Sequence, residues 1–411
     1  MNMADKKIEV LSPAGDMERL IMDLTYGADA VYLAGKRFGM RAAAGNFGAD
    51  ELKLAVDMCH AKGVKTYVTC NNVMRNGDAA QISGFLEQLQ SAGADAVIAT
   101  DVGVISLAKK YAPKLDIHIS TQAGIANFES ARVFYEMGAK RVILARELTL
   151  DEIAELRAKT PKDLEIETFV HGSMCVSFSG RCMLSDYFTG RDANRGACAQ
   201  PCRWKYHLVE EKRPGEYFEI TEDGGTYILN SRDLCMIEHI PELIAAGVDS
   251  IKIEGRTKSA YYAAVTTNAY RHAADAAMAG EELSEIWKRE VYKVSHRPYS
   301  TGFFYAKEGP GEYCGASSYF ADCDVMAQVE ECDDEGNAIL TQRNKFYKGD
   351  TLELLTPEGE PVEFVAEEIF NGEGEEVEST PHPMMEIRMK LPKKAPKYSF
   401  LRKAKEEKAE F

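Results

Sequence analysis

Long apolar runs are absent from this 411-residue sequence. No stretch reaches the roughly 18 apolar residues typical of a membrane-spanning helix, and the polar first residues do not form a signal peptide. These absences predict a cytoplasmic protein with no membrane partner. Because thiols stay reduced in the cytoplasm, clustered cysteines are expected to be metal ligands or catalysts rather than disulfides.

Two common hydrolase motifs are also missing. The sequence contains neither a Gly-x-Ser-x-Gly motif nor a His-Glu-x-x-His zinc motif. A Cys–His pair formed by His171 and Cys175, four residues apart, keeps proteolysis as an alternative. Such a pair uses one thiol, however, and the sequence clusters several.

Basic residues are outnumbered by acidic ones. The chain has 49 Lys and Arg against 65 Asp and Glu, a net charge of −16, which argues against binding nucleic acid by bulk electrostatics. Residues 180–206 reverse this balance, with five basic residues (Arg181, Arg191, Arg195, Arg203, Lys205) against Asp186 and Asp192. This local excess suits an anionic ligand, although the arginines can also simply pair with neighbouring carboxylates.

Half of the ten cysteines gather in one part of the chain. They are Cys175, Cys182, Cys198, Cys202 and Cys235. Six residues separate the first two, which is wider than the tight Cys-x2-4-Cys pairs of structural zinc modules. An iron–sulfur cluster tolerates irregular spacing, and four thiolates complete a [4Fe–4S] site. We therefore predict a [4Fe–4S] cluster, with zinc or catalytic thiols as alternatives.

Short apolar runs alternate with amphipathic helical patterns. The runs begin at Ile8, Ala30, Lys65, Ala96, Ile117, Arg141, Glu165 and Ser250, and helical patterns cover 50–62, 80–92, 102–111 and 151–159. This alternation is typical of an α/β fold with a parallel sheet, and eight units close a (β/α)8 TIM-like barrel. Glycines before several runs, as in Ala-Gly-Ala-Asp-Ala-Val, predict helix C-caps.

The barrel is expected to span residues 1–300, with a cysteine-rich insertion at 172–248 between strands seven and eight. Because active sites of such barrels lie at the C-terminal ends of the strands, the insertion is expected over the barrel mouth. The polar residues at the expected strand ends are Ser12, Tyr32, Asn71, Asn72, Asp101, Thr121, Gln122, Arg146, Glu147, His171, Glu254 and Arg256.

The pattern changes after the barrel. Residues 301–319 are interpreted as a linker. Short alternating runs with turn signals over 320–395 predict a small all-β C-terminal domain, a β-barrel, and 396–411 form a charged tail expected to be frayed or helical.

Five segments resemble one known family. The stretch Glu167-Thr-Phe-Val-His-Gly-Ser-Met-Cys-Val-Ser-Phe-Ser-Gly-Arg-Cys-Met-Leu-Ser185 resembles the signature of the peptidase U32 family, as do residues 11–16, 191–198, 230–235 and 253–259. The likeness covers nearly the whole chain, including a C-terminal domain typical of the family.

The resemblance implies a function that the family name does not suggest. Similarity to the better-understood members implies an iron–sulfur enzyme that hydroxylates aromatic rings. The tRNA branch, which the chain resembles most, implies conversion of the wobble uridine in the tRNA anticodon loop to 5-hydroxyuridine, with prephenate as a required metabolite. A second U32-family protein is a possible partner. The alternatives are a collagenase-like U32 protease and a non-catalytic RNA- or protein-binding scaffold.

The same resemblance implies roles for individual residues. Cys175, Cys182 and Cys198 match the family's cluster ligands, and the fourth ligand is either Cys202 or Cys235, with Cys235 preferred. Candidate proton-transfer residues are His171, Glu167 and Glu254. Candidate residues for clamping carboxylates or phosphates, or for contacting the substrate at the barrel mouth, are Arg181, Arg195, Arg203, Lys252, Arg256 and Gln122. Trp204, Tyr187 or Phe178 is expected to stack on an extruded base.

Several of these residues also have structural interpretations. The aromatic side chains can pack in a core, and Glu254 can pair with Arg256 or Lys258. His171 can be a satisfied histidine at the end of a strand, and Gln122 can hydrogen-bond within the barrel mouth.

Overall fold

The structure is a computed structural model that describes residues 7–41, 44–204, 206, 208–209, 217–218, 230–306 and 319–405. Most of the expected linker (307–318), the end of the expected tail (406–411) and much of 205–229 lie outside the described residues.

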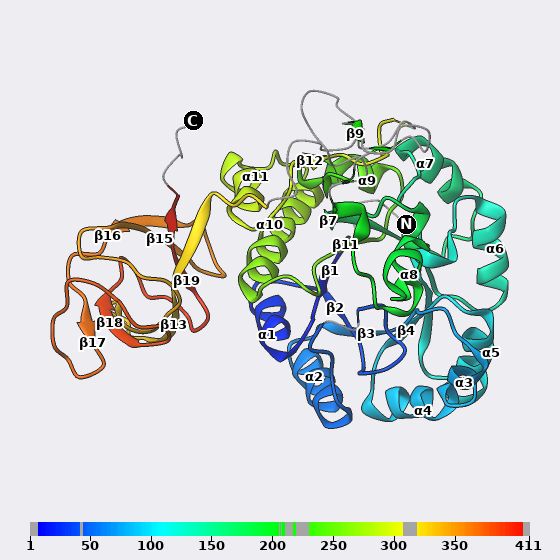
Figure 1. The fold of residues 1–411 in the computed structure, drawn as a ribbon, viewed down its shortest axis with the longest axis horizontal. Coiled ribbons are helices and arrows are strands. Elements are labelled where there is room, and N and C mark those ends of the chain that lie inside the picture. The colour runs from blue at the N-terminus through cyan, green and yellow to red at the C-terminus, as the bar shows by residue number, and fades with distance from the viewer. Residues whose placement is uncertain are drawn as a thin grey trace.

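Eight parallel strands form a closed barrel, as the sequence predicts (Figure 1). The last strand, β11, pairs in parallel with both β1 and β7 and so closes the sheet. The strands are β1 (Glu9–Pro13), β2 (Ala30–Leu33), β3 (Lys65–Cys70), β4 (Ala96–Ala99), β5 (Asp116–Ile119), β6 (Arg141–Ile143), β7 (Glu165–Ser173) and β11 (Ser250–Ile253). Nearly every residue in them is buried, which explains their near-continuous apolar sequences.

Helices surround the barrel (Figure 1). They are α1 (Met17–Thr25), α2 (Ala49–Ala61), α3 (Asn76–Ala79), α4 (Ile82–Ala92), α5 (Val102–Tyr111), α6 (Phe128–Glu136), α7 (Leu150–Ala158), α9 (Ile240–Ala245), α10 (Ala260–Ala279) and α11 (Glu285–Glu290). The predicted glycine caps are confirmed: Gly93 ends α4 in the left-handed region at φ 87° and turns the chain into β4.

Short elements make up the insertion between β7 and β11. They are 3-10 helices η3 (Phe178–Gly180), η4 (Ala193–Arg195) and η5 (Pro201–Arg203), helix α8 (Leu184–Thr189), the pair β8 (Leu208–Val209) and β9 (Tyr217–Phe218), β10 (Asp233–Cys235) and the 3-10 helix η6 (Ile237–His239). Strand β10 runs antiparallel to the end of β7, and β12 (Tyr299–Ser300) pairs with β10.

An antiparallel half-barrel forms the C-terminal region, with its own apolar core. Its strands are β13 (Cys323–Cys332), β14 (Asn337–Gln342), β15 (Thr351–Leu355), β16 (Val362–Val365), β17 (Phe370–Asn371), β18 (Glu386–Lys390) and β19 (Phe400–Ala404). Strand β19 corrects the expectation of a frayed or helical tail at 396–411. It lies between β13 and β15, because Phe400 and Leu401 are buried and its charged residues find partners.

A buried ion network joins the C-terminal region to the barrel helices. The Arg402 guanidinium is fully buried and donates to the Glu290 carboxylate at 2.7 Å and to Glu353. Lys293 lies 3.0 Å from both carboxylates. Two cations thus meet two anions, and the adjacent Leu355 and Phe400 side chains belong to the apolar core of the barrel.

Candidate active site

A cavity of about 580 Å³ opens at the C-terminal ends of the barrel strands. Asn71 follows β3, Gln122 follows β5, Arg146 follows β6 and Glu254 follows β11, and all four line it. The insertion lines the opposite side with its cysteine-bearing loops. The predicted position of the insertion at the barrel mouth therefore agrees with the structure.

Four thiols face this cavity: Cys175, Cys182, Cys198 and Cys202. Two of them accept backbone N–H bonds, Cys182 Sγ from Leu184 at 3.4 Å and Cys198 Sγ from Gln200 at 3.3 Å. Burial raises the pKa of Cys175, and the charges of Cys182 and Cys198 raise it further against the opposing effect of Arg146. Burial likewise raises the pKa of Cys202 to about 11, with smaller contributions from the other three thiols. The four sulfurs therefore share one electrostatic environment.

Cys235 lies elsewhere. It sits in β10 opposite His171, and its Sγ is 3.9 Å from the Tyr270 hydroxyl. It does not line the cavity. Of the two sequence candidates for a fourth ligand, Cys202 is the one that the structure places with Cys175, Cys182 and Cys198.

The thiols are not arranged for a single ion. Among the residues that the structure describes, no three His, Cys, Asp or Glu side chains gather closely enough to hold one metal ion. All four sulfur donors nevertheless line the same cavity, and thiolate donors suit soft metals and iron–sulfur clusters.

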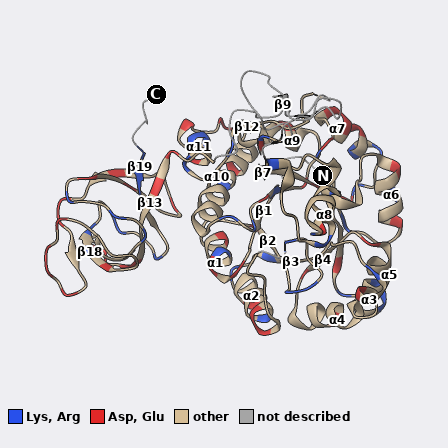
Figure 2. Ribbon diagram, viewed as in Figure 1, with Lys and Arg blue, Asp and Glu red and all other residues tan. Residues whose placement is uncertain are grey.

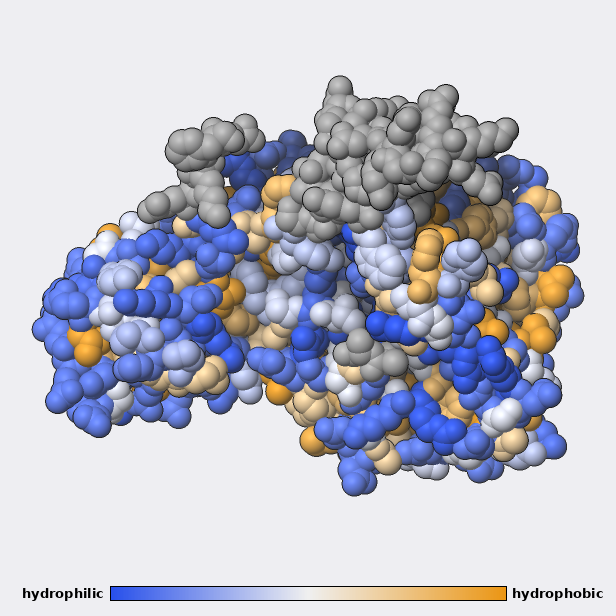
Figure 3. Space-filling view, in the orientation of Figure 1, coloured by the Kyte–Doolittle hydropathy of each residue, from blue (hydrophilic) through white to orange (hydrophobic). Residues whose placement is uncertain are grey.

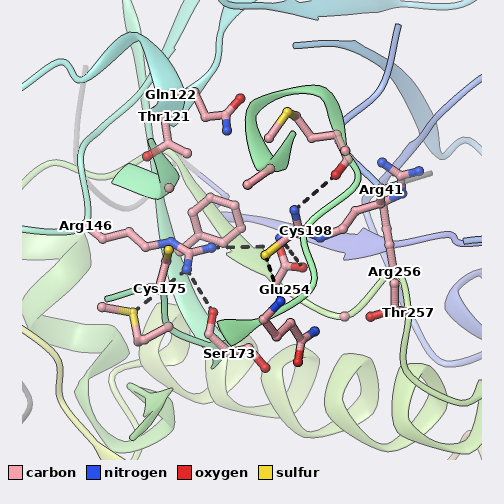
Figure 4. Close-up of a pocket in the computed structure, with 18 of the residues that line it drawn as sticks. Arg41, Thr121, Gln122, Arg146, Ser173, Cys175, Cys198, Glu254, Arg256 and Thr257 are labelled. Atoms are coloured by element: carbon pink, nitrogen blue, oxygen red, sulfur yellow. Dashed lines mark hydrogen bonds and ion pairs between the residues drawn. The ribbon is translucent and has the colours of Figure 1, made fainter. Parts of the chain in front are cut away.

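Three arginines surround one carboxylate beside the thiols (Figure 4). Glu254 lies 3.3 Å from the Arg41 guanidinium and 3.8 Å from that of Arg146. Burial would raise the pKa of Glu254, but the charges of Arg41, Arg146 and Arg256 outweigh it and leave that pKa lowered. Burial lowers the pKa of Arg256 to about 10, so it stays protonated at neutral pH. This arginine cluster therefore carries an excess of positive charge.

Several polar atoms around the cavity lack a partner. The buried atoms Asn71 Oδ1, Gln122 Oε1, Arg203 Nε and Arg256 Nε have no hydrogen-bond partner among the described residues. Because buried polar groups are nearly always satisfied in folded proteins, these atoms indicate a polar ligand or ordered water.

Two of the three predicted proton-transfer residues do not reach the cavity. Glu167 is buried in the barrel between Arg141 at 3.0 Å and Lys252 at 2.8 Å. His171 is enclosed by Tyr270 and Tyr299, whose hydroxyls lie 3.3 and 3.5 Å from its ring nitrogens. Burial lowers the pKa of His171 to about 3, so it stays neutral in the fold.

Glu254 is the predicted proton-transfer residue that does line the cavity. Its ion-pair partners are Arg41 and Arg146 rather than the Arg256 or Lys258 that the sequence suggested. The hydroxyls of Tyr270 and Tyr299 lie at the two ring nitrogens of His171, so among the described residues that histidine is not paired with Cys175.

The predicted substrate-binding residues divide into two groups. Arg203, Lys252, Arg256 and Gln122 line the cavity. Arg181, Arg195 and Trp204 do not.

Each residue of the second group lies outside the lining for a visible reason. The Arg181 side chain donates to the Gln122 carbonyl at 2.7 Å and so lies near the rim. Arg195 pairs with Asp78 and donates to the Val73 carbonyl at 2.9 Å, which anchors the insertion to the loop after β3. Trp204 is exposed to solvent.

Arg41 and Arg146 are the functional candidates to which the sequence assigned no role. Arg146 could have been found from the sequence, because it directly follows the apolar run that begins at Arg141. The Arg146 Nη1 donates to the Ser173 carbonyl at 2.9 Å, and its guanidinium lies 4.0 Å from the centre of the Phe169 ring. Arg41 lies in the long loop after β2, and nothing in the neighbouring sequence marks it as a functional residue.

The fold and cavity define an α/β-barrel protein whose mouth is lined by thiols and guanidinium groups. Residues 15–312 match peptidase family U32, and residues 321–402 match the peptidase family U32 C-terminal domain. The chain belongs to the peptidase U32 family.

Named relatives cover two kinds of activity. The chain is 36% identical to "tRNA hydroxylation protein P1" of Bacillus subtilis, over 97% of this chain and 96% of that protein. It is 34% identical to "23S rRNA 5-hydroxycytidine C2501 synthase" of Escherichia coli, over 78% of this chain and 46% of the relative. It is also 34% identical to a "Collagenase" of Porphyromonas gingivalis, over 74% of each chain.

No helix in the described part of the chain is long and apolar enough to cross a membrane.

Proposed function

We propose that this protein is an iron–sulfur enzyme that hydroxylates the wobble uridine of tRNA to 5-hydroxyuridine. One observation carries the proposal: four thiols and an excess of guanidinium groups line a single cavity at the barrel mouth. The names of relatives that modify tRNA and ribosomal RNA support a nucleic-acid substrate.

Cys175, Cys182, Cys198 and Cys202 are the proposed ligands of a [4Fe–4S] cluster. All four line the cavity, and the Sγ atoms of Cys182 and Cys198 each accept a backbone amide hydrogen bond. When bound, such a cluster supplies electron transfer or Lewis-acid activation of an oxygen donor. Cys235 is the competing assignment from the sequence; it contacts the Tyr270 hydroxyl and is not among the residues that line the cavity.

The arginine cluster is the proposed binding site for prephenate, which carries two carboxylates. Arg41 and Arg146 pair with the single carboxylate of Glu254, and the positive charge of Arg256 acts on the same carboxylate. Because a guanidinium fork matches a carboxylate geometrically, the uncompensated charge favours an anionic ligand with more than one carboxylate. Arg203 Nε and Gln122 Oε1 are further unpartnered groups for the ligand.

Glu254 is the proposed proton acceptor. The arginines keep its pKa low, so it is an ionised carboxylate at neutral pH, and it lines the same cavity as the thiols. The proposal gives no such role to His171 or Glu167, because both are enclosed by protein partners.

A thiol protease is the weaker alternative. The collagenase relative supports it by name. The Cys–His pair that proteolysis would use is not assembled, however, because His171 bonds Tyr270 and Tyr299 and is absent from the cavity lining.

Anaerobic purification followed by iron and sulfide analysis tests the cofactor. We expect about four irons and four sulfides per chain. Substitution of Cys175, Cys182, Cys198 or Cys202 by Ala should remove the cluster, whereas Cys235→Ala should keep it. Loss of iron in Cys235→Ala with retention in Cys202→Ala would reverse the assignment of the fourth ligand. Stoichiometric zinc would contradict the cofactor.

The reaction is tested by mass analysis of tRNA from a strain that lacks the gene. We expect wobble 5-hydroxyuridine to disappear and to return with the wild-type gene but not with Glu254→Gln. Complementation by a cluster-free variant would favour the scaffold alternative. Activity that appears only when a second U32-family protein is added would establish the predicted partner.

A further inference from the structure

An exposed aromatic patch lies beside the cavity. Its members are Tyr187 and Phe188 on α8 and Trp204 directly after η5, and Tyr187 is 82% exposed. Figure 3 shows orange and pale side chains in the area where Figure 1 draws α8. We call these three residues the aromatic patch.

The rings form a continuous surface. The ring centroids of Tyr187 and Phe188 are 5.2 Å apart, and those of Phe188 and Trp204 are 6.1 Å apart. Tyr206 extends the series at 6.0 Å from Phe188. Because the rings brace one another, they offer a rigid surface whose ordering on binding costs little entropy.

The patch is joined to the loops that carry the thiols. Helix α8 begins two residues after Cys182, and Leu184 at its start lines the cavity. The Ser185 hydroxyl donates to the Arg191 carbonyl at 2.7 Å and accepts from the Ala199 amide at 2.9 Å, which ties α8 to the loop of Cys198. The segment that ends at Trp204 includes Cys202 and Arg203, which also line the cavity.

The charge around the patch is positive, unlike that of the rest of the chain. Exposed Arg181 and Arg191 flank α8, and residues 180–206 hold five basic residues against two acidic ones. In contrast, the C-terminal residues 319–405 carry 19 acidic and 11 basic residues, and Figure 2 shows red segments along that region. An anionic partner would therefore be attracted to the barrel mouth and repelled by the C-terminal half-barrel.

We propose that Tyr187, Phe188 and Trp204 form a stacking surface for unpaired RNA bases next to the base that enters the cavity. Aromatic rings interleaved with arginines are the usual surface for single-stranded nucleic acid, because bases stack on the rings and phosphates meet the cations. This inference rests on the proposed RNA substrate. It adds the position on the protein at which the unpaired loop of the RNA docks.

Binding of a fluorescently labelled anticodon stem-loop RNA, measured by anisotropy, tests the surface. A fully paired duplex of similar length is the comparison ligand. Each of Tyr187→Ala and Trp204→Ala should weaken stem-loop binding about tenfold, because stacking on one base is lost. Duplex binding and the salt dependence should be unchanged, since both depend on phosphate contacts.

Two variants serve as controls. Trp204→Phe keeps an aromatic face and should retain most of the affinity. Tyr347→Ala removes a comparably exposed tyrosine from the C-terminal region and should have no effect. Unchanged iron content in all variants shows that the cluster loops remain folded.

The emission of Trp204 gives a direct second measurement. The chain has two tryptophans, and Trp287 is buried in a stack with His272 at 3.7 Å. In a Trp287→Phe background, stem-loop RNA should change the emission of Trp204, and duplex RNA should not.

The outcomes separate this inference from the proposed function. If wild-type protein binds and hydroxylates the RNA and the alanine variants do so equally well, the stacking surface is wrong and the function stands. If wild-type protein shows no preference for the stem-loop and no hydroxylation, both fail. Capture of a protein through the patch, without any loop preference, would also overturn the inference.

Discussion

Two ion networks in this molecule differ in their charge balance. Between the domains, Arg402 and Lys293 face Glu290 and Glu353, so two cations meet two anions. In the cavity, Arg41, Arg146 and Arg256 face Glu254 alone. The first network satisfies itself and holds two parts of the chain together. Within the described part of the chain, the second keeps positive charge that protein groups do not neutralise, which is the expected property of a site for an anion.

The largest expected effect comes from breaking the balanced network. Arg402→Met should destabilise the protein by about 3 kcal/mol or more, because it leaves the buried Glu290 and the partly buried Glu353 without their main partner. Urea unfolding measures this loss. Because the network lies away from the cavity, the iron content of the folded variant should match that of wild type. A loss below about 1 kcal/mol would show that water replaces the guanidinium and that the interface does not depend on the network.

Substitutions in the unbalanced network should change ligand affinity rather than the stability of the fold. Arg256→Gln should weaken prephenate binding roughly 10- to 100-fold, because a hydrogen bond to a charged group contributes about 1.5–3 kcal/mol. Isothermal titration calorimetry measures the affinity. Glu254→Gln is the matched opposite change, and it should strengthen binding because it removes the competing carboxylate. Equal affinity in wild type and Arg256→Gln would place the anion elsewhere.

The same contrast explains what the sequence could predict. The eight barrel strands follow from local apolar runs such as 250–254, which can be recognised without knowing which strands they pair with. Strand β19 was missed because Arg402 and Lys403 look like solvent-facing charges. Arg402 becomes a core residue only when Glu290, 112 positions earlier, lies against it.

The same limit applies to the site: local patterns located part of it, and contacts between distant residues could not be predicted. The cysteine cluster and the strand-end rule placed the insertion and Glu254 at the cavity. The sequence could not identify Arg41 as a site residue, because its partner Glu254 is 213 positions away and the intervening chain carries no marker of their contact. The sequence left His171 two interpretations, a proton-transfer residue and a satisfied histidine at the end of a strand. The length of β7 was not visible in the sequence: the strand continues to Ser173 and pairs there with β10, so His171 lies inside it.

The buried histidine gives a prediction on pH. His171 is neutral in the fold with a pKa of about 3, lowered by burial and then by His296 and Lys258, whereas in the unfolded chain it takes up a proton below its ordinary pKa of 6.5. The unfolded state therefore binds more protons as the pH falls from 6.5 toward 3, and stability declines. In His171→Gln this part of the decline should vanish, so the variant's unfolding free energy should depend less steeply on pH in that window. Identical slopes for variant and wild type would mean that His171 is protonated in the fold.

The smallest expected effect concerns a hydrogen bond at the interface between the domains. The buried Tyr26 hydroxyl donates to the Tyr398 carbonyl at 3.0 Å, an uncharged bond beside the Arg402 network. Tyr26→Phe should cost about 1 kcal/mol in urea unfolding, because it removes one neutral hydrogen bond and keeps the ring. A cost as large as that of Arg402→Met would show that shape and hydrogen bonding, rather than the ion network, hold the C-terminal region on the barrel.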